Sequence, residues 1–201
     1  SKLGDIHSKM GNLELALKYF EDSAQLEKEL HETYPQDVSY KNGLAISYSK
    51  LGSIHSTMGN LEVALKYFED YAQLEKELHE TYPQDVAYKY GLAISYSQLG
   101  DIHSTMGNLE VALKYFEDYA QLSKELHETY PQHVSYKNGL AISYSQLGSI
   151  HSTMGNLEVA RSFIKESINI WEELAKDYPS HVEFKSNLDW AREKMDELEA
   201  K

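Results

Sequence analysis

The sequence contains no cysteine, only four prolines and no long uncharged apolar run. The lack of cysteine excludes a disulfide scaffold and favours a reducing compartment, so we expect a cytoplasmic protein. The lack of an apolar run excludes a transmembrane helix. Basic residues are also scarce, with 19 Lys and Arg against 32 Asp and Glu. The net charge of −13 disfavours both nucleic acid and anionic membrane surfaces as partners.

What the chain does contain is a sequence repeat with a period of 48 residues. Near-identical copies begin at Leu3, Leu51 and Leu99, and a fourth copy begins at Leu147 and diverges after Ala160. Repeats of about 20–50 residues are typical of solenoids, in which each unit packs only on its neighbours. We therefore expect a single array over residues 1–201. Its predicted parts are units at 3–50, 51–98, 99–146 and 147–180, followed by a capping helix at about 182–200.

Each unit is predicted to form two helices. In the first unit, apolar residues recur with the i, i+3, i+4 spacing of an amphipathic helix, Pro35 stops this helix, and Asp37 can cap the next one. Gly43 lies inside that next helix and follows Asn42, so a turn is the alternative there. We predict a continuous helix at this site and its equivalents. After a partial helix in 1–10, the predicted helices cover 13–34, 38–58, 61–82, 86–106, 109–130, 134–154, 157–178 and 182–200.

The residues Leu51-Gly52, Ala64 and Phe68 resemble the pattern of the tetratricopeptide repeat. The period is longer than that family's usual 34 residues by seven residues in each helix, and two extra turns keep the same faces inward. The resemblance implies an all-α fold, an α-solenoid in which antiparallel helix pairs form a superhelix. Long-helix arrays of this kind are similar to those in large bacterial signalling proteins. The resemblance also implies close helix approach at Gly52 and its equivalents Gly4, Gly100 and Gly148.

Histidine is the only residue type that suggests a metal site. His7, His55, His103 and His151 recur once per repeat, so they are too far apart to converge within about 2 Å of one ion. We expect them instead to be half-buried aromatic residues that pack between helices. No phosphate loop or nucleophile motif is present in the sequence. We therefore expect a protein that is not an enzyme and has no cofactor and no metal.

The positions at which the copies differ point to a binding surface. Residues 51–98 and 99–146 differ at five positions, and three of these lie on one stripe of the first helix in the pair. By resemblance, this helix lines the concave face of the superhelix, and the stripe follows the i, i+3, i+4 spacing of one helix face. Drift at tolerant exposed sites is the alternative explanation. The predicted groove residues are Asn42, Ile46, Ser49, Ser53, Ala87, Tyr90, Ile94, Ser97, Asp101, Asn138 and Ile142.

Two hypotheses of function follow. In the first, the chain is a protein–protein interaction scaffold that binds a peptide or protein segment in its concave groove, with Tyr90 and Ile94 as anchors. In the second, it is a structural spacer or a self-associating assembly array, either natural or consensus-designed. The partial helix at 1–10 favours the second hypothesis, because it predicts end-on self-association through a truncated N-terminal repeat.

Overall fold

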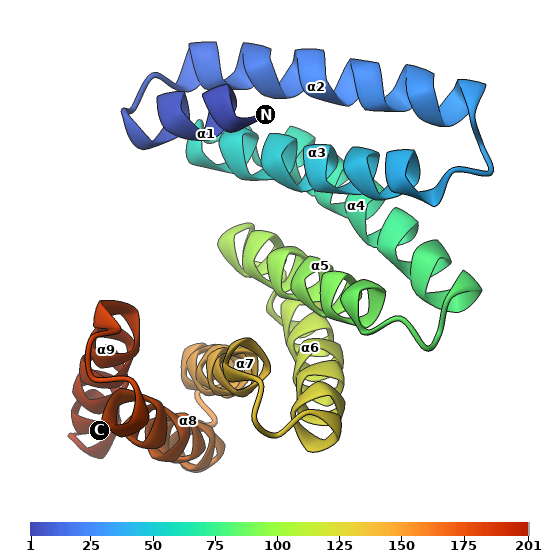
Figure 1. Cartoon of the computed structure of the whole chain (residues 1–201). Coiled ribbons are helices and arrows are strands. Elements are labelled where there is room, and N and C mark those ends of the chain that lie inside the picture. Colours follow the sequence, from blue (N-terminus) through green and yellow to red (C-terminus); the bar gives the residue numbers. More distant parts are fainter. Residues whose placement is uncertain (201) are drawn as a thin grey trace. The chain divides into compact units, whose positions relative to one another are not determined.

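The computed structural model describes residues 1–200, and these form nine α-helices without any strand (Figure 1). Every helix begins and ends within one residue of the bounds predicted from the sequence. The helices are α1 (Lys2–Lys9), α2 (Leu13–Thr33), α3 (Val38–Thr57), α4 (Leu61–Thr81), α5 (Val86–Thr105), α6 (Leu109–Thr129), α7 (Val134–Thr153), α8 (Leu157–Asp177) and α9 (Val182–Glu199). The all-α prediction is confirmed. The helices α3, α5 and α7 also run unbroken through Gly43, Gly91 and Gly139, as predicted.

The short loops between helices have the chemistry that the repeat predicts. Gly59 ends α3 with a φ of +80°, a left-handed conformation that glycine adopts without steric cost. The carboxylate of Asp37 accepts a hydrogen bond of 3.0 Å from the backbone N–H of Ser39 and so caps α3. His133 stands at the same place before α7 and makes no capping bond with its side chain. These turns reverse the chain, so helices that follow one another within one unit of the structure run antiparallel.

The chain divides into two compact units, one over Ser1–Met106 and one that begins at Gly107. In the first unit α1 packs on α2, α2 on α3, α3 on α4 and α4 on α5. In the second, α6 packs on α7, α7 on α8 and α8 on α9. Packing between sequence neighbours is what defines an α-solenoid.

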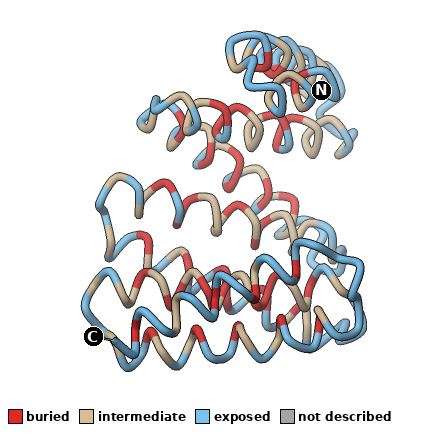
Figure 2. The backbone as a smooth tube through the Cα atoms, turned by 90° about the vertical axis from the view of Figure 1, so that its left-hand side faces the viewer, coloured by how far each residue is buried: buried red, intermediate tan, exposed pale blue. Residues whose placement is uncertain are grey.

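Each unit has a core formed by the inward faces of these helices (Figure 2). In the first unit Ala16 and Phe20 of α2 enclose Leu51 and Ile54 of α3. The equivalent residues of α6 and α7 form the same cluster in the second unit, where a further cluster joins α7, α8 and α9 around Trp171. Burial of such side chains contributes about 1.5–3 kcal/mol each, so the repeat's apolar pattern accounts for the fold.

The recurring histidines have the structural role that the sequence predicted. The ring of His55 stacks on Tyr67 with centroids 5.6 Å apart, and His7 stacks on Tyr19 at 5.5 Å. Each is half-buried between the two helices of its hairpin. The prediction of aromatic packing is therefore confirmed at these positions.

Candidate functional site

The predicted groove residues of the first unit lie on α3 and α5. On α3 they are Asn42, Ile46, Ser49 and Ser53, which follow one helix face. Ile46 is 50% exposed although its neighbours Ala45 and Ser47 are buried. An exposed isoleucine on an otherwise polar helix face is available to contact an apolar group of a ligand.

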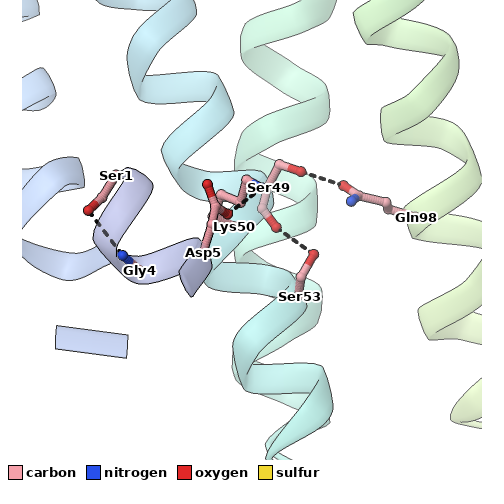
Figure 3. A network of polar contacts seen from close by, with 7 residues as sticks. All are labelled: Ser1, Gly4, Asp5, Ser49, Lys50, Ser53 and Gln98. Atoms are coloured by element: carbon pink, nitrogen blue, oxygen red, sulfur yellow. Dashed lines mark hydrogen bonds and ion pairs between the residues drawn. The ribbon is translucent and has the colours of Figure 1, made fainter. Parts of the chain in front are cut away.

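The hydroxyl groups of Ser49 and Ser53 on this face form hydrogen bonds within the protein (Figure 3). Ser49 donates a hydrogen bond of 3.0 Å from its Oγ to Oε1 of Gln98 on α5. Ser53 donates from its Oγ to the backbone carbonyl of Ser49 at 2.9 Å. The ammonium of Lys50 on α3 lies 2.7 Å from the carboxylate of Asp5 on α1. These side chains link α1, α3 and α5, the first helices of successive repeats, and hold their exposed faces in register.

On α5 the predicted residues are Ala87, Tyr90, Ile94, Ser97 and Asp101. Ala87 and Asp101 are exposed, and the other three are half-buried. Tyr90, Ser97 and Asp101 each interact with another residue of the protein. The structure therefore places Ile46 and Ile94 on neighbouring helices of one unit, with the Ser49–Gln98 hydrogen bond between these helices.

The predicted residues of the second unit, Asn138 and Ile142, lie on α7 and contribute to its packing. Oδ1 of Asn138 accepts a hydrogen bond of 2.9 Å from the indole Nε1 of Trp171, which is almost completely buried. Ile142 is half-buried and packs against the cluster around the same tryptophan. Both side chains therefore stabilise the second unit.

Sequence reasoning missed Trp190 on α9. This residue stands one period after Ile142, at the same position of the repeat as Ile46 and Ile94. Its large side chain is 43% exposed. Extension of the 48-residue register into the capping helix would have identified it, because the position carries a large apolar residue in every copy that contains it.

A hollow lies in the first unit between α2 and α4. It has a volume of about 830 Å³. Tyr48 of α3 and Tyr67 of α4 line it, with ring centroids 5.8 Å apart. Burial, and then the carboxylates of Glu21 and Asp70, raise the pKa of Tyr67. The hollow is therefore lined by two aromatic rings together with acidic and basic side chains. Its lining is completed by Asp22, Ala24, Gln25, Lys28, Leu51, Glu62, Val63 and Lys66.

Within residues 1–200, His, Asp and Glu side chains nowhere gather in a group of three or more that could hold a metal ion. In the same part of the chain, every helix is too short or too polar to cross a membrane.

Comparisons with known proteins identify the repeat. A sequence model described as the tetratricopeptide repeat matches residues 1–77 and 91–173. No curated protein sequence matches the chain significantly. Among solved structures, BtubC (BKLC) from P. vanneervenii is 17% identical with a TM-score of 0.59, and the match covers 91% of this chain and 72% of that one. The Rap conjugation gene regulator of the plasmid pLS20, solved in complex with the Phr* peptide, is 16% identical with a TM-score of 0.58, covering 98% of this chain and 52% of that one.

Proposed function

Because the chain belongs to the tetratricopeptide repeat family, whose members are typically protein–protein interaction scaffolds, we propose that it holds a peptide or protein segment on α3 and α5. The proposed surface consists of the predicted groove residues of these two helices, and we call it the stripe. It comprises Asn42, Ile46, Ser49, Ser53, Ala87, Tyr90, Ile94, Ser97 and Asp101. The repeat array is part of a larger signalling protein in this proposal, and its ligand is a segment of another protein.

The observation that carries the proposal is the exposure of Ile46 on a face whose polar side chains are fixed. Because these polar side chains are already ordered, less entropy is lost when a ligand docks on them. Ile94 and Tyr90 on α5 extend this apolar surface, and Asp101 gives it one acidic end. We expect a ligand with an apolar side chain toward Ile46 and Ile94 and a donor or cation toward Asp101.

A peptide ligand has a precedent at the level of the fold. The Rap conjugation gene regulator, which has the same fold, was solved with the Phr* peptide. This likeness supports a peptide as the class of ligand and does not identify the ligand's sequence. Asn138 and Ile142 are assigned to packing, so the proposal centres on the first unit.

The test begins with a peptide selected by display against the wild-type protein. Ile46→Ala and Tyr90→Ala should each weaken its binding about fivefold or more, since truncation of an anchor typically costs 1 kcal/mol or more. Val63→Ala is the matched control, because Val63 is an exposed apolar residue of α4 beside the hollow between α2 and α4. Thermal unfolding of each variant separates loss of binding from loss of structure. If Val63→Ala weakens binding and the stripe variants do not, the stripe is refuted and that hollow becomes the binding site.

One observation favours a second function, self-association of the array. Leu3 and Ile6 of α1 and Met10, which directly follows this helix, are 51%, 52% and 67% exposed. Their equivalents in the next repeat include Leu51 and Ile54, which are 1% and 2% exposed because α2 covers them. The apolar side chains of α1 are therefore exposed where the equivalent side chains of α3 are buried, and a second copy could supply apolar surface to cover them.

Sedimentation over a wide concentration range tests this second function. We expect reversible dimers at high concentration, and we expect Ile6→Lys to abolish them. Val159→Lys is the matched control, because Val159 is an exposed apolar residue of α8. Dimers that persist in Ile6→Lys, or a monomer at all concentrations, would contradict self-association through α1.

A further inference from the structure

Glu75 of α4 is an acidic residue in a buried position, where an ionised side chain is energetically unfavourable. Its side chain is only 3% exposed, and its Oε2 has no hydrogen-bond partner within the described residues. An ionised carboxylate without partners is strongly disfavoured in a protein interior, whereas the neutral acid is tolerated far better. The sequence alone gave no sign of this, because Glu75 stands among the many acidic residues of an amphipathic helix.

The carboxyl group lies directly against the backbone of α5. A Cβ atom on Gly91 would collide with Oε2 of Glu75, so the carboxyl occupies space that only glycine leaves open. One turn earlier on α4, the hydroxyl of Tyr71 donates a hydrogen bond of 3.1 Å to the carbonyl oxygen of Gly91. Glu75 and Tyr71 thus both contact α5 at Gly91, the residue that directly follows Tyr90 of the stripe.

The repeats themselves provide comparisons for this position. Glu27 faces Gly43 in the same way in the first repeat, but Ser23 replaces Tyr71 there and the side chain of Glu27 is half exposed. In the third repeat Tyr119 is retained and the acid is replaced by a buried serine, Ser123. A buried acid beside a buried tyrosine is therefore found at this position in the second repeat and not in the first or third.

Within residues 1–200, no cationic side chain lowers the pKa of Glu75. Of the groups that face it, Tyr71 comes from α4 and Tyr88 comes from α5, and both are uncharged at neutral pH. From α3, the ammonium of Lys41 is bound by Glu77 instead. Burial alone therefore raises the pKa of Glu75 to about 7, from the value of about 4.5 that it would have in the unfolded chain.

We propose that Glu75 makes the α4–α5 interface responsive to pH, so that this interface is tight when the carboxyl is protonated and loosened when it ionises. Because a raised folded-state pKa favours the protonated folded form, the stabilising state is fully present below pH 4.5 and is lost as the pH rises through about 7. Since the interface carries Tyr90 and Ile94, the biological consequence, which rests on the proposed function, is pH-dependent binding at the stripe.

Glu75→Gln tests the proposal, because it keeps the shape of the side chain and removes its charge. In the wild type, the equilibrium constant for unfolding of the first unit should rise on the order of 100-fold between pH 4.5 and 7 through this group, and this rise should be absent in Glu75→Gln. Glu27→Gln is the matched control and should keep the wild-type pH dependence. Glu75→Ser, the replacement that the third repeat contains, serves as a second variant if the amide is not accommodated.

Direct titration of the Glu75 carboxyl by carbon NMR measures the group itself. A midpoint near 7 supports the proposal, and a midpoint near 4.5 overturns it. Equal pH dependence in the wild type, Glu75→Gln and Glu75→Ser would also overturn it. None of these measurements uses a ligand, so their failure is distinguishable from failure of the proposed stripe. The affinity for a selected peptide can then be measured over the same pH range. If it changes with pH in the wild type and not in Glu75→Gln, ionisation of Glu75 also controls binding at the stripe.

Discussion

A Cβ atom on Gly52 of α3 would lie 2.5 Å from Cε1 of Phe68 in α4. The aromatic ring therefore packs directly on the backbone of the neighbouring helix. Gly4 meets Phe20 in the same way, and Gly148 meets Ile164, which replaces the phenylalanine in the last repeat. The prediction of close approach at these glycines is confirmed.

Gly52→Ala should reduce the free energy of unfolding by about 1–3 kcal/mol, because the added methyl overpacks a buried ring that has no room to move. Gly139→Ala is the matched control in α7. A Cβ atom there would meet nothing nearer than the hydroxyl of Tyr119 at 3.7 Å. Loss of glycine from a helix interior should then stabilise this variant by about 0.5–1 kcal/mol. Chemical denaturation of both variants measures the difference, and equal effects would contradict the packing argument.

Asn138→Ala should destabilise the second unit by about 1–3 kcal/mol, because it leaves the buried indole N–H of Trp171 without its acceptor. Asn42, its equivalent on α3, is the control, and Asn42→Ala should change the free energy of unfolding by less than about 0.5 kcal/mol. Tryptophan fluorescence during denaturation follows the second unit. A stable Asn138→Ala variant would show that this hydrogen bond is dispensable.

Tyr119→Phe should lower the free energy of unfolding by about 0.5–1.5 kcal/mol, the usual contribution of a hydrogen bond. The buried hydroxyl of Tyr119 donates to the carbonyl oxygen of Gly139 at 3.1 Å, and the variant loses this bond. Tyr130→Phe, at an exposed loop tyrosine, should leave the stability unchanged. Thermal unfolding of the two variants is sufficient to compare them. Equal melting temperatures would indicate that water replaces the lost donor.

Glu77→Gln should weaken stability at neutral pH and not in strong acid. Its hydrogen bond from Lys41 is the main cause that lowers the pKa of this carboxyl in the folded state. A lowered pKa contributes stability that is present above the unfolded-state value and lost as the pH falls through the folded-state value. Because the ion pair of Lys41 and Glu77 is partly exposed, we expect the variant to lose less than about 1 kcal/mol of the free energy of unfolding. Denaturation at pH 7 and pH 2.5 should show a difference from wild type only at pH 7, and Glu62→Gln should show none at either pH.

The helices and their order could be predicted because they depend on local sequence signals, and each signal recurs in every copy of the 48-residue repeat. The spacing of Ala16, Phe20 and Ala24 identifies a helix face, the proline after each second helix ends it, and Gly59 reverses the chain. Asn42-Gly43 does not form the alternative turn, and α3 continues through it. Gly43 lies against the side chain of Glu27 of α2, a contact that the local sequence does not show.

The candidate site could be predicted only as a set of positions. Helical spacing placed Ile46 and Ile94 at equivalent positions, but it could not show that Ser49 bonds to Gln98 or that Asn138 bonds to Trp171. Both bonds join residues on different helices more than 30 positions apart. Their partners follow from how side chains meet across helix interfaces, which is not encoded in the spacing along one helix.

The fold class and the helix bounds could be predicted from the sequence alone, since both follow from periodicity and turn chemistry within one repeat. The glycines at which helices approach were predicted from the resemblance to the tetratricopeptide repeat. The burial of individual polar side chains, by contrast, depends on the tertiary structure. Glu75 and Glu27 have the same local sequence on both sides except at the fourth residue before them, where Tyr71 corresponds to Ser23. That one difference accompanies a buried carboxyl in the second repeat and a half-exposed one in the first. Solvation of a charge depends on every group around it, so only the packed structure shows it.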